Sequence, residues 1–155
     1  MWNTKRSVYL SIVVCIALSI ILFGLIFFGL PLFELFMTHF RGVAPESGVL
    51  EILKKAFAGC FYPSALFAGM MLYALLKLLF NIKNDDVFIR KNVTYLKMIS
   101  WGCFIIGTIT LAGCIFYMPF LFVSAAGGFT GILLRVLSNV MQRAVELKEE
   151  NDLTI

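Results

Sequence analysis

The feature that most constrains this chain is a set of four apolar stretches, each long enough to cross a lipid bilayer. They cover residues 8–30, 57–80, 98–118 and 120–141. A transmembrane α-helix needs about 20 apolar residues to cross a hydrocarbon layer of roughly 30 Å. Helices are also favoured there because every backbone polar group must find its partner within the protein. We therefore predict an all-α integral membrane protein, with residues 1–155 forming one domain of four transmembrane helices.

The composition excludes a soluble domain. Hydrophobic residues make up 61% of the 155 residues, and charged residues only 14%. A soluble domain of this size cannot bury that much apolar surface, so the lipid bilayer must be the solvent for most of the chain. The first apolar stretch follows MWNTKR but is too long for a cleaved signal peptide and has no small-x-small cleavage site. It is better interpreted as an uncleaved signal anchor.

The distribution of lysine and arginine predicts the orientation. If the N-terminus is cytosolic, the cytosolic side holds ten basic residues: Lys5, Arg6, Lys77, Lys83, Arg90, Lys91, Lys97, Arg135, Arg143 and Lys148. The opposite side then holds three, namely Arg41, Lys54 and Lys55. Because basic residues concentrate on the cytosolic side, we predict two antiparallel hairpins with both termini in the cytosol.

The connections between the stretches differ in length and character. The outer segment 31–56 is long and partly apolar, which predicts one or two short interfacial helices. The cytosolic loop 81–97 contains a strand-like run at 87–89 followed by a basic pair. The outer turn around Met118 and Pro119 is very short, so the third and fourth spans should lie against each other.

The cytosolic tail 142–155 continues the helical pattern of the fourth span. Apolar residues at 136, 140, 144 and 147 form a stripe with helical spacing. The fourth helix should therefore extend into the cytosol by two or three turns, until Asn151 and Asp152. The apolar residues Leu153 and Ile155 then need a protein surface, which could be the 86–92 segment of the same chain or another protein.

No constellation typical of an enzyme is visible. The sequence has one histidine and no nucleophile triad, phosphate-binding loop or metal-ligand spacing. We therefore expect a non-enzymatic protein with no cofactor and no metal site. His39 fits an ordinary interfacial residue better than a pH sensor. The four cysteines lie within apolar runs and are interpreted as small core residues.

Two cations lie near the cytosolic ends of their spans. Lys77 and Arg135 occupy equivalent places in a weak internal repeat, LLKLLFN against LLRVLSN. Their long side chains could reach the lipid headgroups, which is the favoured interpretation, or they could bind a ligand inside the bundle. Arg135 is the better functional candidate, because it lies deeper and precedes a polar run.

Small residues in the fourth span indicate a close helix contact. Ser124 and Gly128 are four residues apart, as are Gly127 and Gly131. In lipid, such residues let two helix backbones approach closely, and packing then holds the helices together. A hinge or a substrate path is the alternative interpretation.

Three motifs resemble a bacterial membrane family known only as domain of unknown function 2975. They are FIRKN followed by YLK (residues 88–97), LRV with an asparagine two residues beyond (134–139), and the terminal AVELKEENDLTI (144–155). The resemblance covers nearly the whole chain and implies a multi-pass protein of the bacterial inner membrane. It also implies an association with small helix-turn-helix regulators, but no reaction.

Three functions remain open at this point. The first is a membrane regulator or sensor that engages a cytosolic partner, such as a helix-turn-helix transcription regulator, without binding nucleic acid itself. The second is an immunity protein against a membrane-active peptide, and the third is a small transporter subunit. A homo-oligomer is also left open. The candidate partner-binding residues are Phe88, Arg90, Lys91, Asn92, Arg135, Glu150, Asn151, Asp152, Leu153, Thr154 and Ile155.

Overall fold

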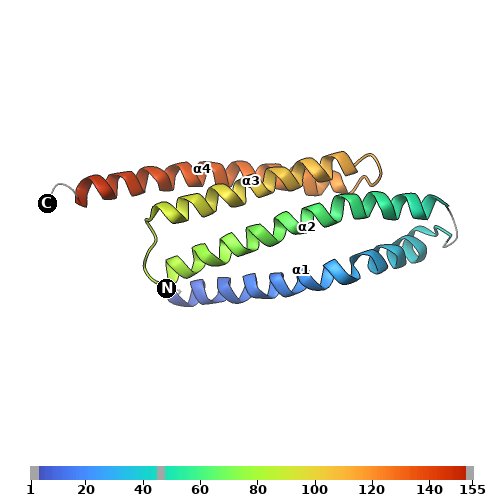
Figure 1. Ribbon diagram of the computed structural model, residues 1–155, viewed down its shortest axis with the longest axis horizontal. Helices are drawn as coiled ribbons and strands as arrows, with labels where there is room; N and C mark the ends of the chain where they lie inside the picture. Colours follow the sequence, from blue (N-terminus) through green and yellow to red (C-terminus); the bar gives the residue numbers. More distant parts are fainter. Residues whose placement is uncertain (1–3, 45–47, 153–155) are drawn as a thin grey trace.

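The computed structural model describes residues 4–44 and 48–152 and contains four long α-helices (Figure 1). They are α1 (Thr4–Arg41), α2 (Gly48–Lys83), α3 (Arg90–Gly113) and α4 (Phe120–Asp152). No strand occurs among these described residues. All four helices are long and apolar enough to cross a membrane, which confirms the prediction of an all-α, multi-pass membrane protein.

The helices lie side by side in a single row, in the order of the sequence (Figure 1). Within the described residues, α1 packs on α2, α2 on α3 and α3 on α4, and Phe57 of α2 also stacks on Phe120 at the start of α4. The start of α1, the α2–α3 connection and the end of α4 lie together at one end of the row. We call this the basic end, because it carries most of the lysines and arginines. The other end carries the α1–α2 and α3–α4 connections.

The outer segment 31–56 differs from the prediction of short interfacial helices. Helix α1 continues through Pro31 to Arg41, and α2 already begins at Gly48. The apolar side chains of this segment pack between the two helices, where Phe33, Met37 and Leu50 form a buried cluster. This burial stabilises the helical extensions more than an interfacial position would, because both helices are already adjacent there.

The connection between α2 and α3 is also shorter than predicted. It spans only residues 84–89, and residues 87–89 form no strand. Helix α2 ends in a motif in which the Asp86 amide donates to the Asn81 carbonyl and the Asp85 amide to the Ile82 carbonyl. Asp85 has a φ of 65°, the left-handed conformation that this motif requires and that glycine usually supplies.

Helices α3 and α4 approach each other through glycine. A Cβ atom on Gly127 would lie 3.2 Å from the Cys103 carbonyl oxygen and 3.4 Å from the Gly107 Cα. Two buried serines add hydrogen bonds: Ser100 donates to the Gly131 carbonyl at 2.8 Å and Ser138 to the Val93 carbonyl at 3.4 Å. Small and polar side chains therefore form this interface.

The apolar stripe of the tail does not face α3. Val136, Val140 and Leu147 are all more than half exposed, whereas Ser138 and Val145 are buried. Within the membrane, large apolar side chains such as Val136 and Val140 gain nothing from facing another helix, whereas the Ser138 hydroxyl gains a partner there. The pattern of apolar residues therefore indicated the helix but not its packed face.

Helices α1 and α2 contact each other through large aromatic side chains. The rings of Phe33 and Phe57 stack with centroids 4.2 Å apart, and Phe57 stacks on Phe61 at 5.3 Å. Tyr117 and Phe120, from the α3–α4 connection and the start of α4, complete this group. We call these five residues the aromatic cluster. One ion pair, Lys54 to Glu34 at 2.6 Å, lies close by.

Candidate functional site

The start of α3 and the end of α4 meet at the basic end, and a buried asparagine fixes the loop beside them. The Asn92 side chain is fully buried. Its amide nitrogen donates to the carbonyls of Asp86 and Val87 at 2.7 and 2.8 Å, and its oxygen accepts from Asn81 at 2.7 Å. The connection after α2 is therefore held in one conformation against α3.

Arg90 and Glu149 join the two helices at their ends. The guanidinium donates two bonds to the carboxylate, Nε to Oε1 at 2.8 Å and Nη2 to Oε2 at 2.5 Å. The two side chains are 78% and 43% exposed, so the pair lies at the surface. Each charge has the sign that its own helix dipole disfavours, since Arg90 begins α3 and Glu149 lies near the end of α4. Pairing between the helices offsets this.

The Arg90–Glu149 pair is the first of three contacts along one flank of the α3–α4 interface. Next comes Lys97, which donates to the Gln142 side-chain oxygen at 2.8 Å. The third contact places the Arg135 guanidinium 5.7 Å from the centre of the Trp101 ring. The members follow a seven-residue spacing, at 90 and 97 on α3 and at 135, 142 and 149 on α4, which keeps them on one face of each helix.

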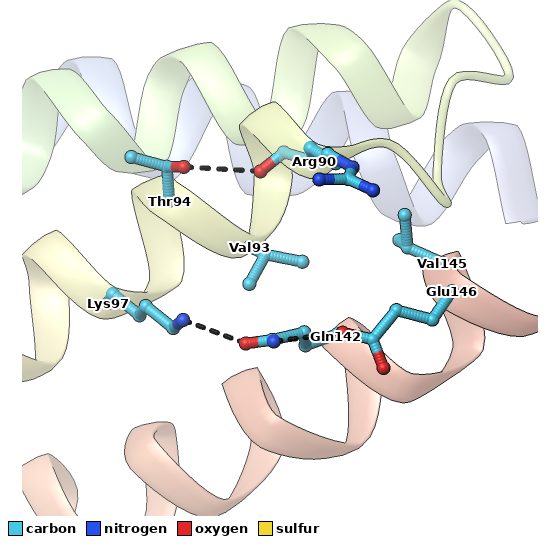
Figure 2. A pocket seen from close by; sticks show the side chains of 7 residues that line it. All are labelled: Arg90, Val93, Thr94, Lys97, Gln142, Val145 and Glu146. Atoms are coloured by element: carbon cyan, nitrogen blue, oxygen red, sulfur yellow. Dashed lines mark hydrogen bonds between the residues drawn. The ribbon is translucent and has the colours of Figure 1, made fainter. Parts of the chain in front are cut away.

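Two hollows open on either side of Arg90. The loop hollow, of about 470 Å³, is lined by Asp86, Phe88, Ile89, Arg90, Lys91, Lys148 and Glu149. The interhelix hollow, of about 200 Å³, is lined by Arg90, Val93, Thr94, Lys97, Gln142, Val145 and Glu146 (Figure 2). Lys97 and Gln142 lie two turns along the helices from the Arg90–Glu149 pair. The interhelix hollow therefore lies closer to the membrane than the loop hollow.

The predicted partner-binding residues have different positions. Phe88 is 48% exposed and lines the loop hollow together with Arg90 and Lys91. Glu150 and Asn151 are exposed on the last turn of α4, which ends at Asp152. The other predicted residues, Leu153, Thr154 and Ile155, lie outside the described residues, and so does the predicted contact of this tripeptide with segment 86–92.

Asn92 has surroundings that the prediction did not foresee, whereas the exposure of Arg135 agrees with the favoured interpretation of a side chain that reaches the headgroups. The Asn92 side chain is enclosed and bonded to the protein itself, so it holds the loop and offers no polar group to a partner. Arg135 is exposed on the outside of the row beside Trp101, rather than inside a bundle. Lys77 is likewise exposed, with its ammonium 5.7 Å from the Tyr73 ring centre.

Several residues of the site were not among the candidates. Lys97, Gln142, Glu146 and Lys148 line the two hollows. The seven-residue spacing from Arg90 to Lys97 and from Arg135 through Gln142 was the available signal in the sequence. It required knowing that α3 and α4 run antiparallel and in contact.

The residues predicted for helix packing lie mainly at the α3–α4 contact. Gly127 meets Gly107, and a Cβ on Gly131 would lie 3.1 Å from the Phe104 ring. The Ser124 carbonyl also lies against Gly107, whereas a Cβ on Gly128 would meet nothing within 4 Å. His39 is exposed near the far end of α1. Among the described residues no three His, Cys, Asp or Glu side chains gather at a site suited to a metal ion.

Comparison with known proteins identifies the class but not an activity. The chain is a multi-pass membrane protein, and residues 6–155 match the family model described as protein of unknown function, DUF2975. The match covers nearly the whole chain, so the protein belongs to this family. No curated protein and no solved structure matches the chain.

Proposed function

We propose that this protein is a membrane-anchored regulator that binds a cytosolic protein at the basic end. The observation that carries the proposal is the convergence of the 84–89 connection, the start of α3 and the end of α4 on one exposed, charged surface. Phe88, Lys91 and Lys148 lie around the loop hollow, and the structure gives neither lysine an ion pair among the described residues. Aromatic rings are enriched in the core of protein-binding surfaces, and charges at the rim attract a partner of opposite charge.

The partner we favour is a helix-turn-helix transcription regulator. Such a regulator would be held at the membrane through acidic and apolar groups that complement Lys91, Lys148 and Phe88. The family resemblance implies an association with small helix-turn-helix regulators, and this association supports the choice. The protein would act by binding, without catalysis and without contacting nucleic acid.

The proposal includes an orientation. Both the start of α1 and the end of α4 lie at the basic end. The sequence analysis assigns ten of the thirteen lysines and arginines to this side of the membrane. The positive-inside rule then favours a cytosolic basic end in a bacterial inner membrane. A reporter cysteine at Lys148 should resist a membrane-impermeant reagent in intact cells, and one at Gly42 should react. If position 148 is labelled and position 42 is not, the orientation is the opposite of the one proposed.

Transcript profiles test the function. Lys91→Glu and Lys148→Glu should reproduce the expression changes of a gene deletion, with normal protein levels in the membrane. The matched control is Arg41→Glu, which reverses a charge at the opposite end and should leave transcripts unchanged. A deletion without any transcript change would contradict the proposal. An effect of Arg41→Glu alone would favour the immunity function, which requires the outer surface.

A further inference from the structure

The membrane-facing margin of the interhelix hollow lies at the depth of the lipid headgroups. The apolar stretch of α3 begins at residue 98 and that of α4 ends at residue 141. Lys97 and Gln142, which are bonded to each other, therefore mark the boundary of the hydrocarbon layer. Trp101 lies one turn further in, at the level where tryptophan is enriched in membrane proteins.

Two cations on this flank lack an acidic partner. Lys97 is half-buried, and its hydrogen bond goes to the neutral amide of Gln142. Arg135 contacts the Trp101 ring, and no carboxylate among the described residues forms an ion pair with either cation. A charge that is partly removed from water needs an opposite charge or strong hydrogen bonds. The site therefore favours an anion.

The acidic groups nearby are already engaged. Glu149 pairs with Arg90 at the outer rim, and the Glu146 carboxylate accepts a bond from the Gln142 amide nitrogen at 3.0 Å. Figure 2 shows Lys97 and Gln142 bonded across the hollow, with Glu146 beyond Gln142. Glu146 reduces the positive charge of the hollow, but its hydrogen-bonded partner is Gln142 rather than Lys97.

We propose that the flank of the α3–α4 contact between Lys97 and Arg135, at the membrane-facing margin of the interhelix hollow, binds the phosphate of an anionic phospholipid from the leaflet at the basic end. Lys97 lines the hollow and Arg135 lies beyond it beside Trp101, so the phosphate would lie between the hollow and the Trp101 ring. An acyl chain would continue along the exposed face of Trp101. Basic pockets between transmembrane helices bind anionic headgroups by the same combination of charge and depth. This inference does not depend on the proposed regulatory function.

Quenching of Trp101 fluorescence by brominated lipids measures the proposed binding. The full-length Trp2→Phe protein has Trp101 as its one tryptophan. In mixed vesicles, brominated phosphatidylglycerol should quench Trp101 with about tenfold higher relative affinity than brominated phosphatidylcholine, given two cations in reach. Lys97→Gln and Arg135→Gln should each lower this preference about fivefold. Lys77→Gln, which removes an interfacial lysine from α2, should leave it unchanged.

A second variant acts in the opposite direction. Glu146→Gln removes the acidic side chain of the hollow and should raise the preference for the anionic lipid, so the test does not depend on the stability of the Lys97 variant. An equal preference in the parent, Lys97→Gln and Arg135→Gln proteins would overturn the proposal. Inorganic phosphate should displace no more lipid than sodium chloride does at the same ionic strength. Displacement by phosphate would instead assign this flank to a soluble phosphate compound.

Discussion

The α3–α4 pair and the α1–α2 pair are both antiparallel helix contacts, yet they are built from different side chains. Gly107 and Gly127 let α3 and α4 approach closely, and buried serines bond across the contact. The outer part of the α1–α2 contact is instead formed mainly by large side chains, with Phe33 stacked on Phe57. Lipid tails compete with aromatic rings for apolar contact but cannot replace backbone proximity or hydrogen bonds. We therefore expect α3–α4 to be the more rigid pair, suited to hold a binding surface.

Replacing Gly127 should destabilise the α3–α4 contact more than any other substitution considered. In Gly127→Leu the Cβ atom would lie only 3.2 Å from the Cys103 carbonyl oxygen, so the leucine side chain has no room. We expect a loss of about 2–3 kcal/mol in the free energy of unfolding, as for other overpacked contacts. Unfolding in mixed detergent micelles measures it. Gly128→Leu is the control, because its Cβ meets nothing within 4 Å; equal losses would mean that close approach is not what holds the pair.

Asn92 tests the polar contribution near the basic end. Asn92→Ala removes three hydrogen bonds from a fully buried site and leaves the carbonyls of Asp86 and Val87 without this donor. The expected destabilisation is about 2 kcal/mol. Hydrogen exchange should rise in segment 84–89, whereas Asn139→Ala at an exposed site of α4 should change neither quantity. Unchanged exchange in this segment would show that Asn92 does not fix the loop.

Truncation in the aromatic cluster should cost less. Phe57→Ala removes stacking on Phe33 and Phe61, with an expected destabilisation of about 1 kcal/mol, because lipid or detergent can fill the space. Phe122→Ala is the control at a 77% exposed position and should be neutral. A loss for Phe57→Ala larger than that for Gly127→Leu would reverse the ranking of the two helix pairs.

The smallest effect is expected at the loop that joins the two pairs. Asp85→Gly relieves the left-handed backbone conformation at φ 65° and should stabilise the protein by about 0.5–1 kcal/mol. Asp86→Gly, at the next position, lacks this benefit and should not stabilise. The same unfolding assay compares them, and a destabilised Asp85→Gly protein would show that the aspartate side chain contributes more than the strain it causes.

Sequence reasoning predicted the helices well because the bilayer imposes a length and a composition on each span. It also selected Gly127 and Gly131, since small residues at four-residue spacing have one main use in lipid. It did not predict the row of helices, because a sequence without helix-to-helix distances does not say which faces meet. It overestimated the lengths of the connections, because the helices continue past the predicted spans where a neighbouring helix buries their side chains, as at Phe33 and Leu50.

The candidate site was predicted in part. Arg90 and Lys91 are exposed, as expected for charged residues, and a contact of the tail with segment 86–92 was predicted only through a fold-back of Leu153 and Ile155. A straight α4 packed antiparallel to α3 achieves the Arg90–Glu149 pair without any fold-back. Asn92 was a binding candidate because it belongs to the 88–97 motif that carries the family resemblance. Its burial depends on carbonyls that only the folded loop presents.

The most direct test of the central claim is photo-cross-linking from the basic end in native membranes. A photoreactive phenylalanine analogue at Phe88 should capture a cytosolic DNA-binding protein, identified by mass spectrometry. The matched position is Phe40, which is 76% exposed near the far end of α1. It should capture lipid but no such protein. Cross-linking of an extracellular peptide at Phe40, with only lipid captured at Phe88, would contradict a regulator that works through its basic end.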